Sequence, residues 1–429
     1  MLERHAKKAT ELAQSVSSSS FRQLLFQVQW MERAQSTMET MVSQRQEEEG
    51  RETLGDADAF ALACYQPLID FARAENVPLR SAEPVAMLGK LALSTWTGFA
   101  TTGLAPLFLP PSFFQQIAWW PAVAHEIAHD VLVATIGADS HLRAQLDLPD
   151  VKNGRIPLGV LSEDITVGEL RRVVGGWFEE IFCDVFGTLM LGPAYVITMV
   201  HLFASPDEPD LVTQVGVDET GKQYVVHPPR HLRVLLCCDL LDRMGHHTEA
   251  VELEEEWEAS HGYPAGISFP VPGFSTEIPV EPLREILEEI CTRLAEEPLQ
   301  AFGGYNLAAI PGVDYGPHRH QESLRSCDEL LRGKAPKGHK PRAVIAGAVL
   351  AWNKEPEREQ EILLRARHAI RGASEWIDHY DMEEASSSVV GNGEPSPREA
   401  FILHTIFAPP LALSHKAKRG RMTPIAPRR

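Results

Sequence analysis

The sequence predicts a mainly α protein of the α+β type, in which a helical core carries a small β element and is flanked by helical regions. Apolar residues recur at helical spacing through most of the 429 residues, and only VGVDETGKQYVV, at 215–226, alternates like a strand, a turn and a second strand. Hydrophobic residues (44%) and charged residues (23%) occur in globular proportions. At about 150 residues per domain, the length corresponds to two or three domains.

The first half of the chain gives several helix signals in order. Apolar side chains in residues 21–42 form an approximate helical stripe, and a second helix is expected over residues 57–74. Residues 96–110 are small and apolar without a clear period, so no element is assigned to them. The next helix is expected to run from Pro121, which suits a first turn, to Gly137, which suits a C-terminal cap.

A longer helix is expected to start near Asp164 or Thr166 and to end before Gly192-Pro193, with Gly175-Gly176 as the point where it would kink or split. Residues 260–283 are rich in glycine and proline and are expected to form a loop. Further helices are expected at 231–244, 281–296, 320–332, 341–352, 356–381 and 397–406.

These signals divide the chain into four parts. They are an N-terminal helical region at 1–95, a core at 96–250, a mainly helical region at 251–384, and a part at 385–429 that combines a flexible link, a short helix and a basic tail. The core carries the residues with recognisable chemistry. The flanking regions are expected to control access to it.

Charge and cysteine content narrow the function classes. Lys and Arg (40) against Asp and Glu (59) give a net charge of −19, which would repel phosphate backbones and argues against nucleic-acid binding. The six cysteines form no CxxC pair, and no signal peptide is visible. The longest apolar stretch, Val185 to Ala204, contains Gly192-Pro193 and is interpreted as a broken buried helix rather than a membrane span. We therefore expect a cytoplasmic protein. The sequence does not fix its oligomeric state.

The segment His125-Glu126-Ile127-Ala128-His129 has the spacing of a zinc site. On a helix, residues four apart share a face, so His125 and His129 can present two imidazoles to one zinc ion. Glu126 would then act as general base on a zinc-bound water. This is the HExxH pattern of zinc hydrolases. The alternative is a buried helix with two hydrogen-bonded histidines.

A third ligand is expected in the apolar segment GGWFEEIFCDVFGTLML at 175–191. Glu180 is the candidate ligand, and Asp184, one turn later, is expected to accept the N–H of His125 and fix its tautomer. Glu179 is a competing ligand, but the Glu-x-x-x-Asp register favours Glu180. Buried carboxylates at these positions require a compensating positive charge, such as a zinc ion. The alternative is a solvated acidic stripe.

The segment His227-Pro228-Pro229-Arg230-His231-Leu232-Arg233 completes a series of motifs. HExxH, then ExxxD, then HPPxxxR resembles the gluzincin zinc metallopeptidases, most closely the family of CAAX prenyl proteases and heat-shock membrane peptidases, including soluble bacterial relatives without an assigned substrate. The resemblance implies a zincin-like core, a catalytic role for His227 as a hydrogen-bond donor to the oxyanion, and a supporting role for Arg233 on a loop or a carboxylate. The alternatives are a turn histidine and an ordinary ion pair.

The sequence thus predicts a zinc-dependent metallopeptidase that acts on a peptide or protein substrate. The predicted metal ligands are His125, His129 and Glu180, with water as the fourth ligand. Two other functions remain open: a zinc hydrolase of non-peptide amides or esters, and a non-catalytic scaffold with a structural zinc.

Four further residues are weaker candidates for a functional role. Tyr195 is expected to pack rather than act as a phenolic donor, and Cys183 to belong to the core rather than to bind metal. His318 and His320 are expected to lie in a loop rather than to bind a metal or substrate.

Overall fold

The computed structural model describes most of the chain, and every structural statement below refers to the described part. Backbone contacts divide the chain into one compact unit, Met1–Glu383, and a second unit, Glu384–Arg429. The second unit, with the predicted helix at 397–406 and the basic tail, lies outside the described residues. The described residues are 18–46, 48–80, 83–89, 94–95, 104–149, 156–157, 166–204, 215–217, 223–225, 227–267 and 278–372.

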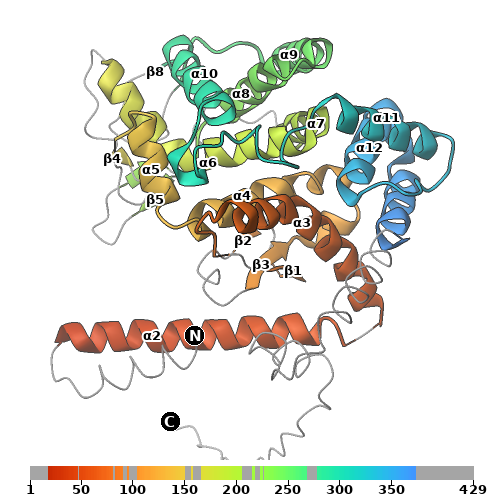
Figure 1. Ribbon diagram of the computed structural model, residues 1–429, viewed down its shortest axis with the longest axis horizontal. Coiled ribbons are helices and arrows are strands. Elements are labelled where there is room, and N and C mark those ends of the chain that lie inside the picture. The colour runs from red at the N-terminus through yellow and green to blue at the C-terminus, as the bar shows by residue number, and fades with distance from the viewer. Residues whose placement is uncertain are drawn as a thin grey trace, which may run out of the picture. The chain divides into compact units, whose positions relative to one another are not determined.

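The fold is mainly helical with short strands between the helices, which confirms the predicted fold class (Figure 1). The described α-helices are α2 (Ser18–Ser43), α3 (Glu48–Glu75), α4 (Ala122–Ala134), α5 (Ala138–Gln145), α6 (Val167–Leu191), α7 (Pro193–Phe203), α8 (Arg230–Arg243), α9 (His247–His261), α10 (Val280–Glu296), α11 (Pro317–Leu331), α12 (Pro341–Lys354) and a last helix over residues 359–372. Short 3-10 helices are η2 (Pro111–Phe114), η3 (Ile117–Trp119), η6 (Gln300–Phe302) and η7 (Pro356–Arg358).

The described strands form three small sheets. In the first, β1 (Glu83–Leu88) runs parallel to β3 (Leu104–Leu109), and β2 (Ser94–Thr95) pairs antiparallel with the other side of β3. The helical prediction for all of 1–95 is therefore wrong at β1 and β2. β1 and β2 are too short to show a reliable alternation of apolar and polar residues. Their partner β3 lies within residues 96–110, where the apolar residues also show no clear period.

The two strands predicted at 215–226 are confirmed by the antiparallel pair β5 (Val215–Val217) and β6 (Gln223–Val225), whereas the turn predicted between them lies outside the described residues. β4 (Ile156–Pro157) pairs with the other side of β6. In the segment predicted as a loop at 260–283, the pair β7 (Gly266–Ile267) and β8 (Ile278–Pro279) forms a short antiparallel ladder. Two residues per strand give no readable alternation, which is why the sequence does not reveal this ladder.

Helix α6 is the central element of the described fold, with α4 packed on one side and α8 and α10 on the other (Figure 1). It starts at Thr166, whose side chain and Glu169 form a reciprocal capping box. The helix runs through Gly175-Gly176 without interruption, so it is not split there. It ends at Gly192, whose φ of +55° requires glycine, and Pro193 begins α7 as predicted.

Helix α4 is shorter than the sequence predicts. It begins after Pro121 and ends at Ala134, and Gly137 is the residue before α5 rather than the C-terminal cap of α4. Gly137 has a φ of +77°, so the glycine signal was real but marked the start of the next helix. Most residues of α4 are buried, because the helix lies between α6 and α3.

One hydrophobic core runs through the described unit, from Leu54 of α3 to Ile370 of the last helix. It therefore continues across two of the predicted boundaries, between residues 95 and 96 and between residues 250 and 251, whereas the third, between 384 and 385, lies outside the described residues. The apolar stretch that approaches membrane-span length consists of the end of α6 and the whole of α7, separated at Gly192. Among the described residues, none of the helices has both the length and the apolar character needed to cross a bilayer.

Candidate metal centre

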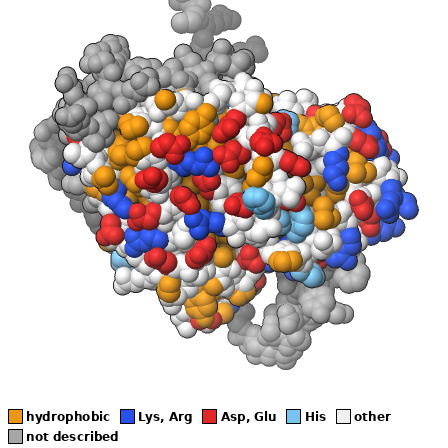
Figure 2. Space-filling view, turned by 90° about the horizontal axis from the view of Figure 1, so that it is seen from above, with side chains coloured by type: hydrophobic (Ala, Val, Ile, Leu, Met, Phe, Trp, Pro, Cys, Tyr) orange, Lys and Arg blue, Asp and Glu red, His pale blue; other side chains and the backbone are white. Residues whose placement is uncertain are grey.

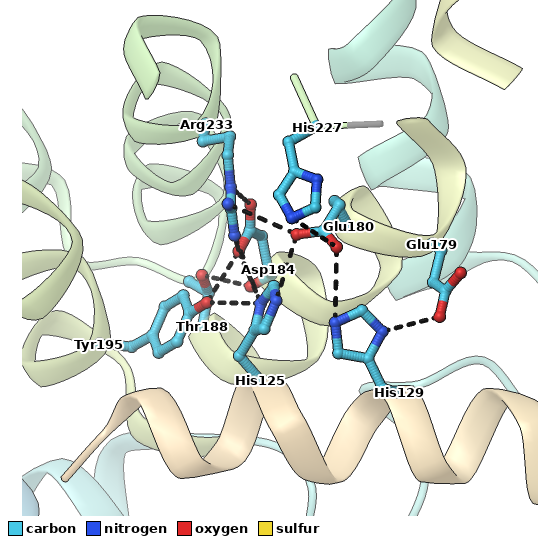
Figure 3. A network of polar contacts seen from close by, with 9 residues as sticks. All are labelled: His125, His129, Glu179, Glu180, Asp184, Thr188, Tyr195, His227 and Arg233. Atoms are coloured by element: carbon cyan, nitrogen blue, oxygen red, sulfur yellow. Dashed lines mark hydrogen bonds and ion pairs between the residues drawn. The ribbon is translucent and has the colours of Figure 1, made fainter. Parts of the chain in front are cut away.

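Helix α4 presents two histidines to the middle of α6. His125 and His129 lie one turn apart, and the centroids of their rings are 4.9 Å from each other. Both imidazoles leave α4 on the side of α6, as Figure 3 shows. The two rings therefore share one face of α4, as their spacing of four residues predicts.

Glu180 of α6 lies directly opposite the two rings. Its Oε2 is 3.4 Å from Nε2 of His125, and its Oε1 is 3.5 Å from Nε2 of His129. Zinc ligands at about 2.0–2.1 Å in a tetrahedral arrangement are about 3.4 Å from one another. Each Nε2 therefore lies about as far from its oxygen of Glu180 as two ligands of one zinc ion lie from each other.

The far side of each imidazole meets a carboxylate. Nδ1 of His125 lies 3.0 Å from Oδ1 of Asp184, and Nδ1 of His129 lies 2.9 Å from Oε1 of Glu179. Because an ionised carboxylate only accepts, each Nδ1–H donates, and the Nε2 atoms are left to face Glu180. Both histidines are thus held in the tautomer that binds a metal through Nε2.

Asp184 is itself held by two partners. Arg233 of α8 donates to both of its oxygens, from Nε at 2.7 Å and from Nη2 at 2.8 Å. The hydroxyl of Tyr195 in α7 donates to Oδ1 at 2.8 Å and lies 3.2 Å from Nδ1 of His125. Burial raises the pKa of Asp184, but Arg233 and the N–H of His125 lower it by more, so the pKa falls to about 2. Asp184 therefore stays ionised although it is fully buried.

The position of Tyr195 depends on a glycine of α6. A Cβ on Gly187 would lie 2.4 Å from Cε2 of the Tyr195 ring, so only glycine lets the ring approach. Thr188 donates its hydroxyl to the main-chain carbonyl of Asp184, at 2.8 Å. Tyr195 packs, as the sequence predicts, but it also contacts the centre through its hydroxyl.

The charges of the metal-free centre balance one another. Burial lowers the pKa of His125, but the hydrogen bonds to Asp184 and Glu180 raise it more strongly, to about 10. Burial raises the pKa of Glu180, whereas His125, Arg233 and His227 lower it well below its usual range. Without a metal, a protonated imidazole thus supplies the positive charge that the buried carboxylates need.

His227 lies between β6 and α8 and points at Glu180 (Figure 3). Its Nε2 is 3.6 Å from Oε1 of Glu180, and its side chain is 28% exposed. Burial lowers its pKa, so the imidazole is neutral near pH 7. Its Nδ1 is buried without a hydrogen-bond partner among the described residues. The structure thus brings the predicted oxyanion donor to the same centre.

Glu126 is half-buried on α4, between the two histidines in sequence. Its negative charge helps to raise the pKa of His129 and the pKa of the thiol of Cys183. All seven predicted site residues are therefore placed in one region, where α4, α6 and the start of α8 meet: His125, Glu126, His129, Glu180, Asp184, His227 and Arg233.

Cys183 also reaches this centre. Its Sγ and one ring nitrogen from each of His125 and His129 lie within 4.8 Å of one another. The thiol is fully buried, and burial together with the charge of Glu180 raises its pKa well above the usual range. Cys183 belongs to the core, as the sequence predicts, and its position three residues after Glu180 also places it on that face of α6.

Glu179, the competing metal ligand that the sequence offers, does not lie beside the Nε2 atoms. Its carboxylate contacts Nδ1 of His129 on the far side of the ring, and its side chain is 50% exposed. Sequence spacing alone does not show this contact, because it depends on how α4 lies against α6.

His318 lies in the first turn of α11 rather than in a loop, and its side chain is 82% exposed beside Glu322.

Comparison of the chain with family models, with curated proteins and with solved structures finds no match.

Proposed function

We propose that the chain is a zinc-dependent metallopeptidase, in which His125, His129 and Glu180 hold the metal. The proposal depends chiefly on one observation: the Nε2 atoms of both histidines face the two oxygens of Glu180 at 3.4 and 3.5 Å. The motifs HExxH, ExxxD and HPPxxxR, with their resemblance to the gluzincins, support the same function.

When bound, zinc would supply an activated water molecule and polarise the carbonyl that the water attacks. Glu126, next to the ligand His125, would take the proton from this water and deliver it to the leaving amine. His227, neutral and partly exposed, would donate its N–H to the oxyanion. Asp184 and Arg233 would act as positioning residues, since they hold the ring of His125.

The first sheet offers a place for an extended peptide. β2 is an edge strand of this sheet and contacts α4. A peptide that adds to such an edge gains main-chain hydrogen bonds without depending on its sequence. The sequence gives no signal for this edge, because β2 and β3 carry no readable period. The edge beside α4 supports a peptide or protein as substrate.

The test combines metal analysis with digestion. Full-length protein is expected to contain zinc at the α4–α6 centre and to cut a peptide library at defined sites. Removal of the metal with a chelator should abolish cutting, and one equivalent of zinc should restore it. Cleavage that survives complete removal of the metal would contradict the proposal.

A second candidate function is a structural zinc in a scaffold, and the position of Cys183 favours it. With Sγ as fourth ligand, the centre would be closed and no position would remain for water. Replacement of zinc by cobalt separates the two functions: a sulfur-to-cobalt charge-transfer band that disappears in Cys183→Ala indicates the closed site. Its absence, together with peptide cleavage, supports the peptidase.

We further propose that the protein works in the cytoplasm. All six cysteines are free and buried, which fits a reducing compartment.

A further inference from the structure

A second group of metal-binding side chains lies outside the α4–α6 centre, where the start of α9 meets the start of α11. His246 immediately precedes α9, Glu249 lies in the first turn of α9, and His320 lies in the first turn of α11. One ligand atom from each of the three lies within 4.8 Å of the other two. Figure 2 shows histidine side chains gathered on the face to which α9 and α11 belong.

The three side chains face one another at short range. The ring centroids of His246 and His320 are 4.6 Å apart, and the rings are tilted by 55°. Oε1 of Glu249 lies 3.7 Å from Nε2 of His320, which is longer than a hydrogen bond but close to the spacing of two ligands on one ion. His246 is buried, whereas the side chain of Glu249 is 36% exposed, so an ion can reach the group from solvent.

Local helix structure does not account for these residues. The side chain of His246 makes no capping hydrogen bond, and its backbone N–H donates to the carbonyl of Leu241. Glu249 therefore has no capping-box partner at the start of α9. Nδ1 of His320 is buried and has no hydrogen-bond partner among the described residues.

The electrostatics of the group suit a cation despite the two helix N-termini. Helix N-termini carry partial positive charge, and the carboxylate of Glu249 offsets it.

We propose that His246, Glu249 and His320 form a second metal site, which takes a divalent transition ion of the zinc class. Two imidazoles and one carboxylate are a donor set that zinc prefers, whereas calcium and magnesium prefer oxygen donors alone. α8 packs on α9, and α11 packs on α12. An ion at this site joins the two helix pairs. The inference does not depend on the proposed peptidase function.

The test counts zinc ions on the full-length chain. Protein loaded with zinc and freed of excess metal is analysed by mass spectrometry of the metal, and a chromophoric chelator measures the affinities. The wild-type chain should retain two zinc ions. His320→Ala should retain one, and Glu249→Gln should bind the second ion at least about tenfold more weakly. His318→Ala, which removes an exposed imidazole from the same turn of α11, should retain both.

Glu180→Gln separates this site from the α4–α6 centre. That variant should lose the centre of the proposed function and keep the zinc held by His246 and His320. Zinc should also raise the Tm of Glu180→Gln by a few degrees, and the added change His320→Ala should remove this rise. If His320→Ala binds as much zinc as His318→Ala, or if Glu180→Gln binds none, the second site is refuted.

Discussion

Arg233 of α8 binds both oxygens of Asp184 of α6, with Nε 2.7 Å from Oδ2 and Nη2 2.8 Å from Oδ1. Both side chains are buried. Asp184 also accepts the Nδ1–H of His125 from α4. A single carboxylate thus connects three helices and sets the direction in which a metal-binding imidazole points.

Asp184→Asn should test this connection. The amide keeps the shape of the side chain but leaves Glu180, 3.4 Å from Nη1, as the remaining counter-charge of the buried Arg233, so the free energy of unfolding should fall by about 3 kcal/mol. Zinc affinity should fall about 10–100-fold, because His125 loses its charged positioning acceptor. Urea unfolding and chelator competition measure the two effects. Asp242→Asn, on the exposed face of α8, serves as the control and should change neither.

Glu179 and Glu180 provide a matched pair of substitutions. Glu180→Gln removes a proposed ligand and should weaken zinc binding by more than the roughly 10–100-fold that is typical for partners of ligands. Glu179→Gln keeps an oxygen that can accept from His129 but removes its negative charge, and it should weaken binding by about tenfold. Titration against a chromophoric chelator gives both values. Equal effects would mean that Glu180 is not a ligand.

Glu126→Gln should separate metal binding from catalysis. The change keeps the size of the side chain and leaves all three proposed ligands in place, so zinc content should stay at the wild-type level. Peptide cleavage should fall about 10²–10⁴-fold, because an amide cannot accept the proton of the attacking water. Cleavage of a fluorogenic peptide measures the loss. Wild-type rates in this variant would exclude Glu126 as the general base.

Gly187→Ala should disturb the metal centre through its contact with Tyr195. The new Cβ would lie 2.4 Å from the Tyr195 ring, so the ring must move away from Asp184, and stability should fall by about 1–3 kcal/mol. Gly168→Ala, in the same helix, meets no atom closer than 3.9 Å and should increase stability by about 0.5–1 kcal/mol. Thermal unfolding of both variants provides the comparison. A stable Gly187→Ala protein with normal zinc affinity would show that the contact of Tyr195 is unimportant.

Zinc uptake near pH 7 should release at least one proton. The pKa of His125 rises from 6.5 to about 10 in the folded metal-free protein, so the imidazole is charged at pH 7 and must lose its proton to bind a metal. Zinc affinity should therefore increase as the pH rises from 7 to 10. Calorimetry in buffers of different ionisation enthalpy counts the protons. Uptake without proton release would contradict the charged state of His125.

The same shift predicts how the stability of the metal-free protein depends on pH. The folded pKa of His125 lies above the unfolded value, so its ion pairs stabilise the fold fully below about pH 6.5. This contribution is lost as the pH rises towards about 10. Denaturant unfolding of metal-free protein at several pH values should show the decrease, and bound zinc should remove it.

The sequence by itself determined the local geometry of the centre. The separation of His125 from His129 and of Glu180 from Asp184 is one helical turn in each case, and the 3.6-residue period places each pair on one face without any tertiary information. The break at Gly192 is equally local, because its backbone conformation requires glycine.

Only the tertiary structure decided which side chains from distant segments meet. Glu179 accepts a hydrogen bond from His129, and Tyr195 donates one to Asp184, because of how α4 and α7 pack against α6. The meeting of His246 with His320 and the pairing of β1 with β3 likewise join segments that are far apart in the chain. Periodicity fixes the face on which a residue lies. The partner that this face meets depends on how the whole core packs, which no local pattern encodes.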